Sequence, residues 1–252
     1  MGIPLTELVH YLDEYLRIDD VPDDPDAMNG LQVEGPTEVR RVAVAVDACL
    51  ATIAGAALWG TDLLIVHHGL FFGPKVPITG AFHRRISALV RHRMGVYACH
   101  APLDVHSEVG NNAVLARGIG MEIEGTFGDY HGGPAGVYGS LAMERDDLIQ
   151  KLEELLGATP RLLPHGLWQT NRVGICTGGA GSLVAAAGAA GIDTFITGEA
   201  PHYAALVAEE VGMNLILGGH YATETVGVGA LSEHLTEQFD LETQFIDHPT
   251  GL

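Results

Sequence analysis

Three short apolar runs of the sequence each end at histidine. The run 63–66 is followed directly by His67 and His68, and two later runs end at His100 and His220. Apolar runs of this length, bounded by turn residues, are typical of buried strands in a parallel sheet, and the carboxyl ends of such strands open onto the crevice where ligands bind. One histidine there is as commonly a solvated loop residue as a metal ligand. Three such strand ends favour a shared metal site.

Carboxylates accompany two of these strand ends. Asp104 follows His100, and Glu224 follows His220 at the start of a predicted helix, where residues four apart share one face at about 6 Å. Imidazole and carboxylate donors without thiolate suit Zn, Mn, Fe, Co or Ni in open coordination. The candidate ligands outnumber the needs of one ion. The sequence therefore predicts a dinuclear centre of two divalent ions, with a carboxylate bridging them.

A weak internal repeat adds Glu199 to the candidates. Residues 42–68 read as strand, Ala-rich helix, a Gly-Thr-Asp turn and a second strand, and residues 172–199 repeat that order with Gly-Ile-Asp at the turn. Glu199 corresponds to His68 at the end of the second strand, so Glu199 and the nearby His202 are expected to face the site. The alternative for Glu199 is a carboxylate near a helix N-terminus.

The repeat and the alternating strands and helices indicate the α/β class. Amphipathic or Ala-rich helices are predicted over 4–17, 48–59 and 82–90, whereas the acidic run 19–26 reads as a loop. Glycines crowd between residues 125 and 139, which is typical of a linker or a domain crossing. We therefore expect two domains, whose extents are 1–125 plus 215–252 for the metal-binding domain and 126–214 for an inserted second α/β domain.

A glycine-rich stretch, 177–182, follows the first strand of the second repeat and invites comparison with phosphate-binding loops. The full Gly-x-Gly-x-x-Gly spacing is absent, so a tight turn is favoured. Nucleotide binding through this loop without metal remains a minority hypothesis, and it would require nucleotide affinity that survives chelation.

The formal charge of −19, with only two lysines, argues against binding of long nucleic acids, which requires a cationic surface. The negative charge does not exclude a small anionic substrate, because bound metal ions can reverse the local electrostatic field. Five of the 13 cationic residues form one basic island, namely Lys75, Arg84, Arg85, Arg91 and Arg93. A solvated helix face or a subunit contact is favoured for this island over a phosphate-facing patch.

The three cysteines are far apart and form no Cys-x-x-Cys pair, so a thiolate zinc site is not expected and reduced packing residues are favoured. No apolar stretch reaches the length of a membrane span without interruption, and the first residues lack a signal pattern. We expect a cytoplasmic protein without a membrane partner.

Four motifs occur in order along the chain: Asn29-Gly30-Leu31-Gln32-Val33, His67-His68-Gly69, His100-Ala101-Pro102-Leu103-Asp104, and Gly219-His220-Tyr221-Ala222-Thr223-Glu224. In these motifs the sequence resembles the Nif-three-like family, whose bacterial members are labelled GTP cyclohydrolase type-two homologues. The resemblance spans almost the whole chain. It implies two related three-layer α/β domains and a toroidal homohexamer built from dimers, with a two-metal site facing the ring interior.

The resemblance also implies roles for individual residues. The ligands would be His68 and Asp104 on one ion, His67 and His220 on the other, and Glu224 bridging both. His100 matches a position next to the metals, as a supporting residue or a proton shuttle. Tyr221 stands where some bacterial relatives have a second histidine, which leaves the ligands intact but changes the pocket.

These residues favour a metal-dependent hydrolase that acts on a small, nucleotide-like or phosphorylated substrate. Two ions would lower the pKa of a shared water to about 7, and His100 or Glu199 would transfer the proton. The established GTP ring-opening enzymes use cysteine with histidine on zinc, and no cysteine here lies in a comparable motif, so the residues do not point to GTP. The alternative function is a non-catalytic, metal-binding hexameric scaffold or regulator, which the acidic surface would suit.

Overall fold

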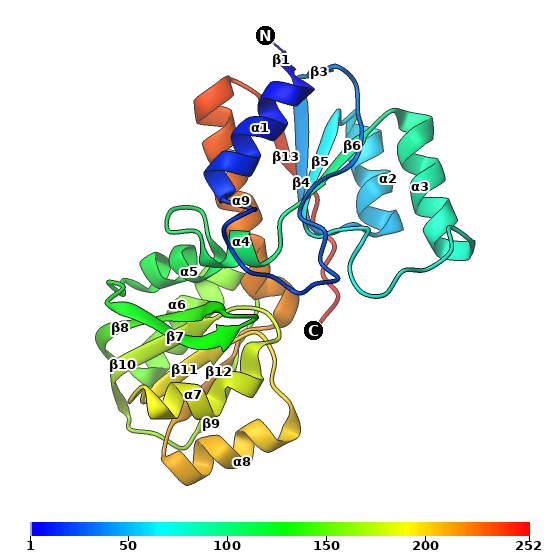
Figure 1. Cartoon of the computed structure of the whole chain (residues 1–252). Coiled ribbons are helices and arrows are strands. Elements are labelled where there is room, and N and C mark those ends of the chain that lie inside the picture. The colour runs from blue at the N-terminus through cyan, green and yellow to red at the C-terminus, as the bar shows by residue number, and fades with distance from the viewer. Residues whose placement is uncertain (1) are drawn as a thin grey trace. The chain divides into compact units, whose positions relative to one another are not determined.

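The computed structural model describes residues 2–252, which form two compact units (Figure 1). The first unit comprises Met1–Leu103 and Val228–His248, and the second comprises Asp104–Gly227 and Pro249–Leu252. Each unit contains one large mixed sheet with helices, which confirms the α/β class. The units differ in extent from the domains expected from the sequence, and the division into 1–125 plus 215–252 and 126–214 stays a prediction.

The sheet of the first unit has five strands. In spatial order they are β13 (Glu242–Phe245), β4 (Arg41–Asp47), β5 (Leu63–His68), β6 (Gly95–Ala98) and β2 (Gly30–Val33). The first four run parallel, and β2 is antiparallel to β6. The central strands are continuous runs of buried apolar residues, as expected for strands covered on both faces. The register pairs Asp47 with His68, so both lie at the carboxyl edge of the sheet.

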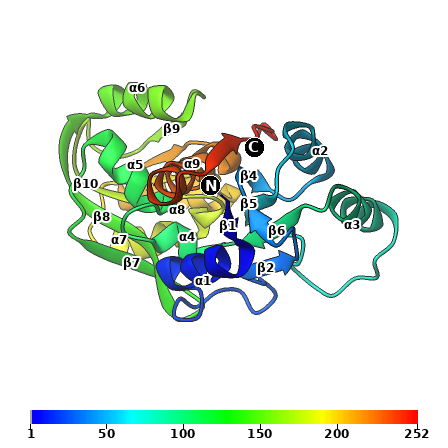
Figure 2. The ribbon, with the colours of Figure 1, turned by 90° about the horizontal axis from the view of Figure 1, so that it is seen from above.

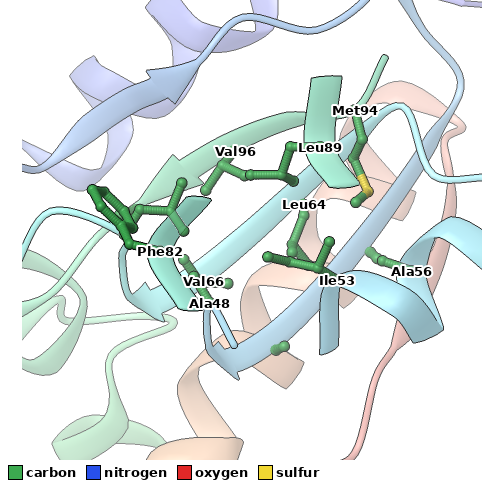
Figure 3. Close-up of a cluster of buried hydrophobic side chains, with 13 residues drawn as sticks. Ala48, Ile53, Ala56, Leu64, Val66, Phe82, Leu89, Met94 and Val96 are labelled. Carbon is green, nitrogen blue, oxygen red and sulfur yellow. The ribbon is translucent and has the colours of Figure 1, made fainter. Parts of the chain in front are cut away.

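One face of this sheet is covered by α2 (Leu50–Trp59) and α3 (Gly80–His92). Leu64 and Val66, two residues apart on β5, point to this face and pack with Ile53 of α2 and Leu89 of α3 (Figure 3). Side chains two apart on a strand share a face, so the apolar run 63–66 divides its residues between both sides.

The opposite face is covered by α1 (Leu5–Leu16) and by the part of α9 (His220–Phe239) that begins at Val228 (Figure 2). The buried residues of α1 recur at helical spacing, and the Tyr11 ring packs edge-on against Phe239 with centroids 4.8 Å apart. Two further short strands, β1 (Ile3–Pro4) and β3 (Glu38–Val39), pair next to α1, and α4 (Ala101–Val105) follows β6. Helices on both faces give the expected three layers.

The second unit has the same three-layer plan. Its strands, in spatial order, are β7 (Gly125–Tyr130), β8 (Gly133–Glu144), β10 (Gln169–Cys176), β11 (Thr194–Thr197), β12 (Asn214–Leu217) and β9 (Arg161–Pro164). One face packs on α5 (Asn111–Ile119) and α6 (Arg145–Leu156). The other packs on the 3₁₀ turn η1 (Ala180–Leu183), α7 (Val184–Ala189) and α8 (His202–Val211). Strands β10, β11 and β12 are parallel, like β4, β5 and β6.

The structure confirms the internal repeat at one pair of aspartates. Asp62 precedes β5, and its Oδ2 accepts the backbone N–H of Arg41 at 3.0 Å. Asp193 precedes β11, and its Oδ2 accepts the backbone N–H of Arg172 at 2.9 Å. In each unit the aspartate therefore bonds to the neighbouring strand one residue before the two strands begin to pair in parallel, at Val42 with Leu63 and at Val173 with Thr194.

The interpretation of residues 125–139 as a linker is wrong. This stretch forms most of the β7–β8 hairpin, whose two-residue turn is His131 and Gly132, both with positive φ. Positive φ at both turn residues suits the right-handed twist of paired strands. A Cβ at Gly136 would lie 2.6 Å from the ring of Phe127, so this glycine allows close packing across the hairpin.

The longest helix, α9, has 20 residues, a length that would suffice to cross a membrane. Its sequence includes Glu224, Glu233 and His234 among small and polar residues. Within the described part of the chain, no helix is both long enough and apolar enough to span a membrane.

Candidate metal centre

Three histidines of the first unit meet at the carboxyl edge of its sheet. His67 and His68 end β5, and His100 follows β6. Each offers a ring nitrogen, and these nitrogens lie within 4.8 Å of one another. The ring centroid of His67 lies 4.7 Å from that of His68 and 5.0 Å from that of His100. The two adjacent histidines therefore converge, as expected at the end of a strand, although neighbours within a regular strand face opposite sides.

A hydrogen bond fixes the orientation of each of these rings. The acceptors of the Nδ1 protons are the Cys99 carbonyl for His67 (3.0 Å), Asp47 Oδ1 for His68 (2.9 Å) and Asp23 Oδ1 for His100 (2.7 Å). Carbonyl and carboxylate oxygens only accept, so Nδ1 carries the proton in each ring. The nitrogen that would coordinate an ion is then Nε2. This is the arrangement that metal-bound histidines adopt in proteins.

The residues that support His100 come from a segment whose sequence predicts a loop and a turn. Asp23 Oδ2 accepts hydrogen bonds from Asn29 Nδ2 at 2.8 Å and from the backbone N–H of Ala101 at 3.0 Å. Asn29 Oδ1 in turn accepts the backbone N–H of His100 at 2.8 Å. Burial alone would raise the pKa of Asp23, but the hydrogen bonds from His100 and Asn29 bring that pKa below its ordinary value.

In the second unit His220 and Glu224 begin α9 on one face, as predicted. His220 Nε2 lies 3.2 Å from Glu224 Oε1, and His220 Nδ1 lies 2.9 Å from Glu199 Oε1. Glu224 is buried, whereas the Glu199 side chain is 52% exposed. The hydrogen bond to Glu224 is the largest influence on His220 and, together with Glu199, raises its pKa to about 9 against the effect of burial. The two carboxylates therefore stabilise positive charge on the His220 ring.

The glycine-rich turn after β10 packs against the same residues. Gly178 has φ +66°, and a Cβ there would collide with Oε1 of Glu224. The Gly178 N–H donates to the hydroxyl of Thr223 at 3.1 Å. The positive φ and the close approach of Glu224 account for glycine at position 178. The structure agrees with the favoured interpretation of a tight turn.

Asp104 is linked to the same helix through Asn111. Asp104 Oδ1 accepts hydrogen bonds from Asn111 Nδ2 at 2.8 Å and from the Thr177 hydroxyl at 3.3 Å. Asn111 Oδ1 accepts the backbone N–H of Gly227 on α9 at 2.8 Å. Asn111 therefore connects Asp104 with the helix that carries Glu224. The sequence does not point to Asn111 as a site residue, and it points to Thr177 only as the first residue of the glycine-rich stretch 177–182.

Other predicted residues lie outside these groups of donors. His202 is exposed at the first residue of α8. In the basic island only Arg85 is partly buried, where it donates to the Ala48 carbonyl at 3.1 Å and stacks over Phe82. The remaining members of the island are exposed, in agreement with a solvated helix face. Cys176 is buried, and burial, with the charges of Asp104 and Glu224, raises the pKa of its thiol, so it stays protonated.

The donors are of types that bind divalent ions. The first unit offers three imidazoles with fixed tautomers, and the second offers His220 Nε2 beside the carboxylate of Glu224, with Glu199 on the Nδ1 side of the ring. Both sets are nitrogen and oxygen ligands of the borderline metals Zn, Mn, Fe, Co and Ni. The described residues thus contain His and Glu groups that could hold a metal ion, as the sequence predicts.

Comparison with known proteins supports the same conclusion. A family model described as Duf34/NIF3 (NGG1p interacting factor 3) matches residues 3–251. A protein named GTP cyclohydrolase 1 type 2 homolog from Deinococcus radiodurans is 41% identical over 248 residues, which cover 98% of this chain and 94% of that protein. Its namesake from Pyrococcus abyssi is 43% identical over 249 residues, covering 98% of each chain.

Solved structures show the same fold. A structural-genomics protein named ybgI, described as of unknown function, superposes with a TM-score of 0.92 at 37% identity, covering 99% of this chain and 100% of that one. TTHA1606 from Thermus thermophilus gives a TM-score of 0.88 at 42% identity with the same coverage. Reduced HcgD from Methanocaldococcus jannaschii gives 0.86 at 22% identity, over 98% of this chain and 99% of that one, and shows the fold alone.

Proposed function

Because the chain belongs to the Duf34/NIF3 family, we propose that it is a dinuclear metal-dependent hydrolase that acts on a small, nucleotide-like or phosphorylated substrate. The observation that carries this proposal is the shared arrangement of four histidines, His67, His68, His100 and His220, each with Nδ1 bonded to a carbonyl or carboxylate oxygen. Such bonds hold the tautomer and ring orientation that metal binding requires. The name of the relatives, GTP cyclohydrolase 1 type 2 homolog, accords with hydrolysis of a nucleotide-like compound.

The proposed ligands come from both units. They are His68 and Asp104 for one ion, His67 and His220 for the other, and Glu224 as the bridge. The support comes from each unit separately, namely the converging histidines of the first and the donors around α9 in the second. Two divalent ions (Zn, Mn, Fe, Co or Ni) would supply Lewis acidity and lower the pKa of a water to about 7.

We assign proton transfer to His100 or Glu199. His100 donates a hydrogen bond from Nδ1–H to the buried carboxylate of Asp23. This carboxylate would stabilise the imidazolium that forms when Nε2 also takes a proton. Glu199 contacts Nδ1 of His220, and its exposed carboxylate would pass a proton to solvent. His67 and Glu224 are buried and would hold their positions while the substrate enters.

The test is a screen of Mn-, Zn- and Fe-loaded protein against nucleotides and phosphodiesters. We expect turnover that falls at least 100-fold in Glu224→Gln, since the bridging carboxylate is lost. Glu233→Gln removes an exposed carboxylate from the same helix and is expected to leave turnover unchanged. Undiminished activity in Glu224→Gln would rule out the scheme. A protein that binds two ions and hydrolyses nothing would favour the metal-binding scaffold instead.

We also propose the toroidal homohexamer that family membership implies. Apolar side chains are exposed on the single chain, including Leu58 of α2 at 92% and Val90 of α3 at 66%, and such residues commonly pack between subunits. Sedimentation equilibrium is expected to give six times the mass of one chain. A monomer at micromolar concentration would contradict this assembly.

A further inference from the structure

A cavity of about 510 Å³ lies in the first unit, between the loop at residues 25–28 and the segment at 70–78. Most of its lining is apolar, and it includes three aromatic rings, those of Phe71, Phe72 and Phe82. Cavities of this size with mainly apolar walls and few polar groups are typical of small-molecule sites. We call this cavity the Phe72 pocket.

Phe72 borders both the pocket and the histidine cluster. Its ring lies edge-on to the imidazole of His100, with centroids 4.9 Å apart, and to that of His68, with centroids 5.9 Å apart. The side chain is 46% exposed, so its position is not fixed by burial in the core. A molecule in the pocket would therefore lie one side chain away from the histidines.

One side chain, Gln32, joins the two walls of the pocket. Its Oε1 accepts the backbone N–H of Leu70 at 2.7 Å, and its Nε2 donates to the carbonyl of Met28 at 2.6 Å. The Met28 N–H also donates to the carbonyl of Phe71 at 3.1 Å. A Cβ at Gly69 would collide with Gln32, which explains the glycine after the histidine pair. The two walls thus form one bonded structure.

Both walls continue directly into the residues that position histidines. The loop 25–28 lies between Asp23 and Asn29, which bind His100. The segment 70–78 begins two residues after His68. A ligand that contacts these walls therefore touches the backbone that holds two of the three rings, which makes the pocket part of the same site.

The lining also indicates the chemistry of the ligand. Phenylalanine walls favour a flat ring, which stacks on them or meets their edges. The pocket is lined by two charged residues, Lys75 and Asp26, and both are exposed. Lys75 is one of only two lysines in a chain of net charge −19. A cation in this setting would bind an anionic group at the rim. The walls and the rim together describe an anionic molecule with an aromatic or heteroaromatic ring.

We propose that the Phe72 pocket binds the flat ring of an anionic substrate, with Phe72 placing that ring beside His68 and His100. This inference rests on the proposed function, since it names the substrate class of the same site. The base of a nucleotide-like substrate would then occupy the Phe72 pocket, and its anionic group would face Lys75.

The first experiment measures binding of 2-naphthalenesulfonate, a flat anionic aromatic compound chosen as a probe that is bound without being hydrolysed. Metal-free protein is titrated and the fluorescence of the naphthalene is followed. We expect saturable binding that weakens at least tenfold in Val76→Asp, at a pocket residue that is 59% exposed and therefore tolerant of substitution. Val211→Asp, at an apolar residue of α8 that is 51% exposed and lies outside the pocket, is the matched control and is expected to bind as the wild type. Equal binding by Val76→Asp, or no saturable binding, would overturn the proposal.

The second experiment tests the position of the ring beside the histidines. The proton NMR lines of 2-naphthalenesulfonate are compared with Co²⁺-loaded and Zn²⁺-loaded protein. We expect selective broadening by Co²⁺, which is absent in Val76→Asp. Binding without broadening would overturn the placement beside the metal centre. Saturable, Val76-dependent binding in a protein that hydrolyses nothing would overturn the hydrolase and support the pocket.

Discussion

Asp23→Asn is the substitution that tests most directly how the first unit positions its histidines. One Asp23 oxygen, Oδ1, accepts hydrogen bonds from His100 Nδ1 and from the backbone N–H of Asp24, both at 2.7 Å. The other, Oδ2, accepts from Asn29 Nδ2 at 2.8 Å and the Ala101 N–H at 3.0 Å. Asparagine replaces one of these oxygens by an NH₂ group. Two of the four donors then face a donor, whichever way the amide is turned.

The expected loss follows from those two hydrogen bonds. The Asp23 side chain is only 7% exposed, so water does not replace the lost acceptor fully. A hydrogen bond to a charged group contributes about 1.5–3 kcal/mol, so we expect the free energy of unfolding to fall by about 3 kcal/mol at pH 7. The pKa of Asp23 is lowered in the folded protein. Its stabilising effect is therefore present above the unfolded pKa of about 3.9 and is lost as the pH falls through the folded value.

The assay is urea unfolding of the metal-free protein at pH values from 7 down to 3, followed by circular dichroism. The matched control is Asp20→Asn, in the same acidic segment, which removes an exposed ion pair with Arg17 and should cost less than about 1 kcal/mol. We expect the difference between wild type and Asp23→Asn to shrink as the pH falls below 4. A loss under 1 kcal/mol at pH 7, or a loss that does not vary with pH, would refute the reasoning.

Two further substitutions test the second unit. Gly178→Ala should weaken Co²⁺ binding at least tenfold, because the added Cβ would displace the Glu224 carboxylate. Gly191 has a similar φ of +72°, but a Cβ there would meet open space, so Gly191→Ala should only lower the free energy of unfolding by about 1 kcal/mol. Spectrophotometric Co²⁺ titration distinguishes them, and equal affinities would contradict the contact. On α6, Leu152 is fully buried, so Leu152→Ala should lower the free energy of unfolding in urea by about 2–5 kcal/mol. Leu155 is 41% exposed, so Leu155→Ala should lower it by less than about 1 kcal/mol. Similar losses in the two variants would contradict the packing.

Local patterns of sequence predicted the strands and the residues that end them. The apolar run 63–66 is a buried strand, and His67 and His68 converge at its end. The repeated Gly-x-Asp turn correctly predicted matching parallel pairs, because the aspartate bonds to the backbone of the neighbouring strand in both copies. Such features depend on a few neighbouring residues, which a single sequence displays.

Long-range partners of the site could not be predicted in the same way. Asp23 and Asn29 lie 77 and 71 residues before His100, and the acidic run around Asp23 has the composition of any exposed loop. Its carboxylate is recognised as buried only once β2 pairs with β6 and brings the segment to the sheet edge. The prediction of a linker at 125–139 is wrong for a related reason, since a linker and a hairpin with positive φ at His131 share the same composition.

The central claim is that one chain binds two divalent ions through its histidines and carboxylates. Elemental analysis measures this directly, on untagged protein dialysed against Mn²⁺, Zn²⁺ or Fe²⁺ and then against metal-free buffer. The account predicts two ions per chain in the wild type, and at most one in His68→Ala and in His220→Ala. One ion or none in the wild type, or two ions retained in both variants, would contradict it.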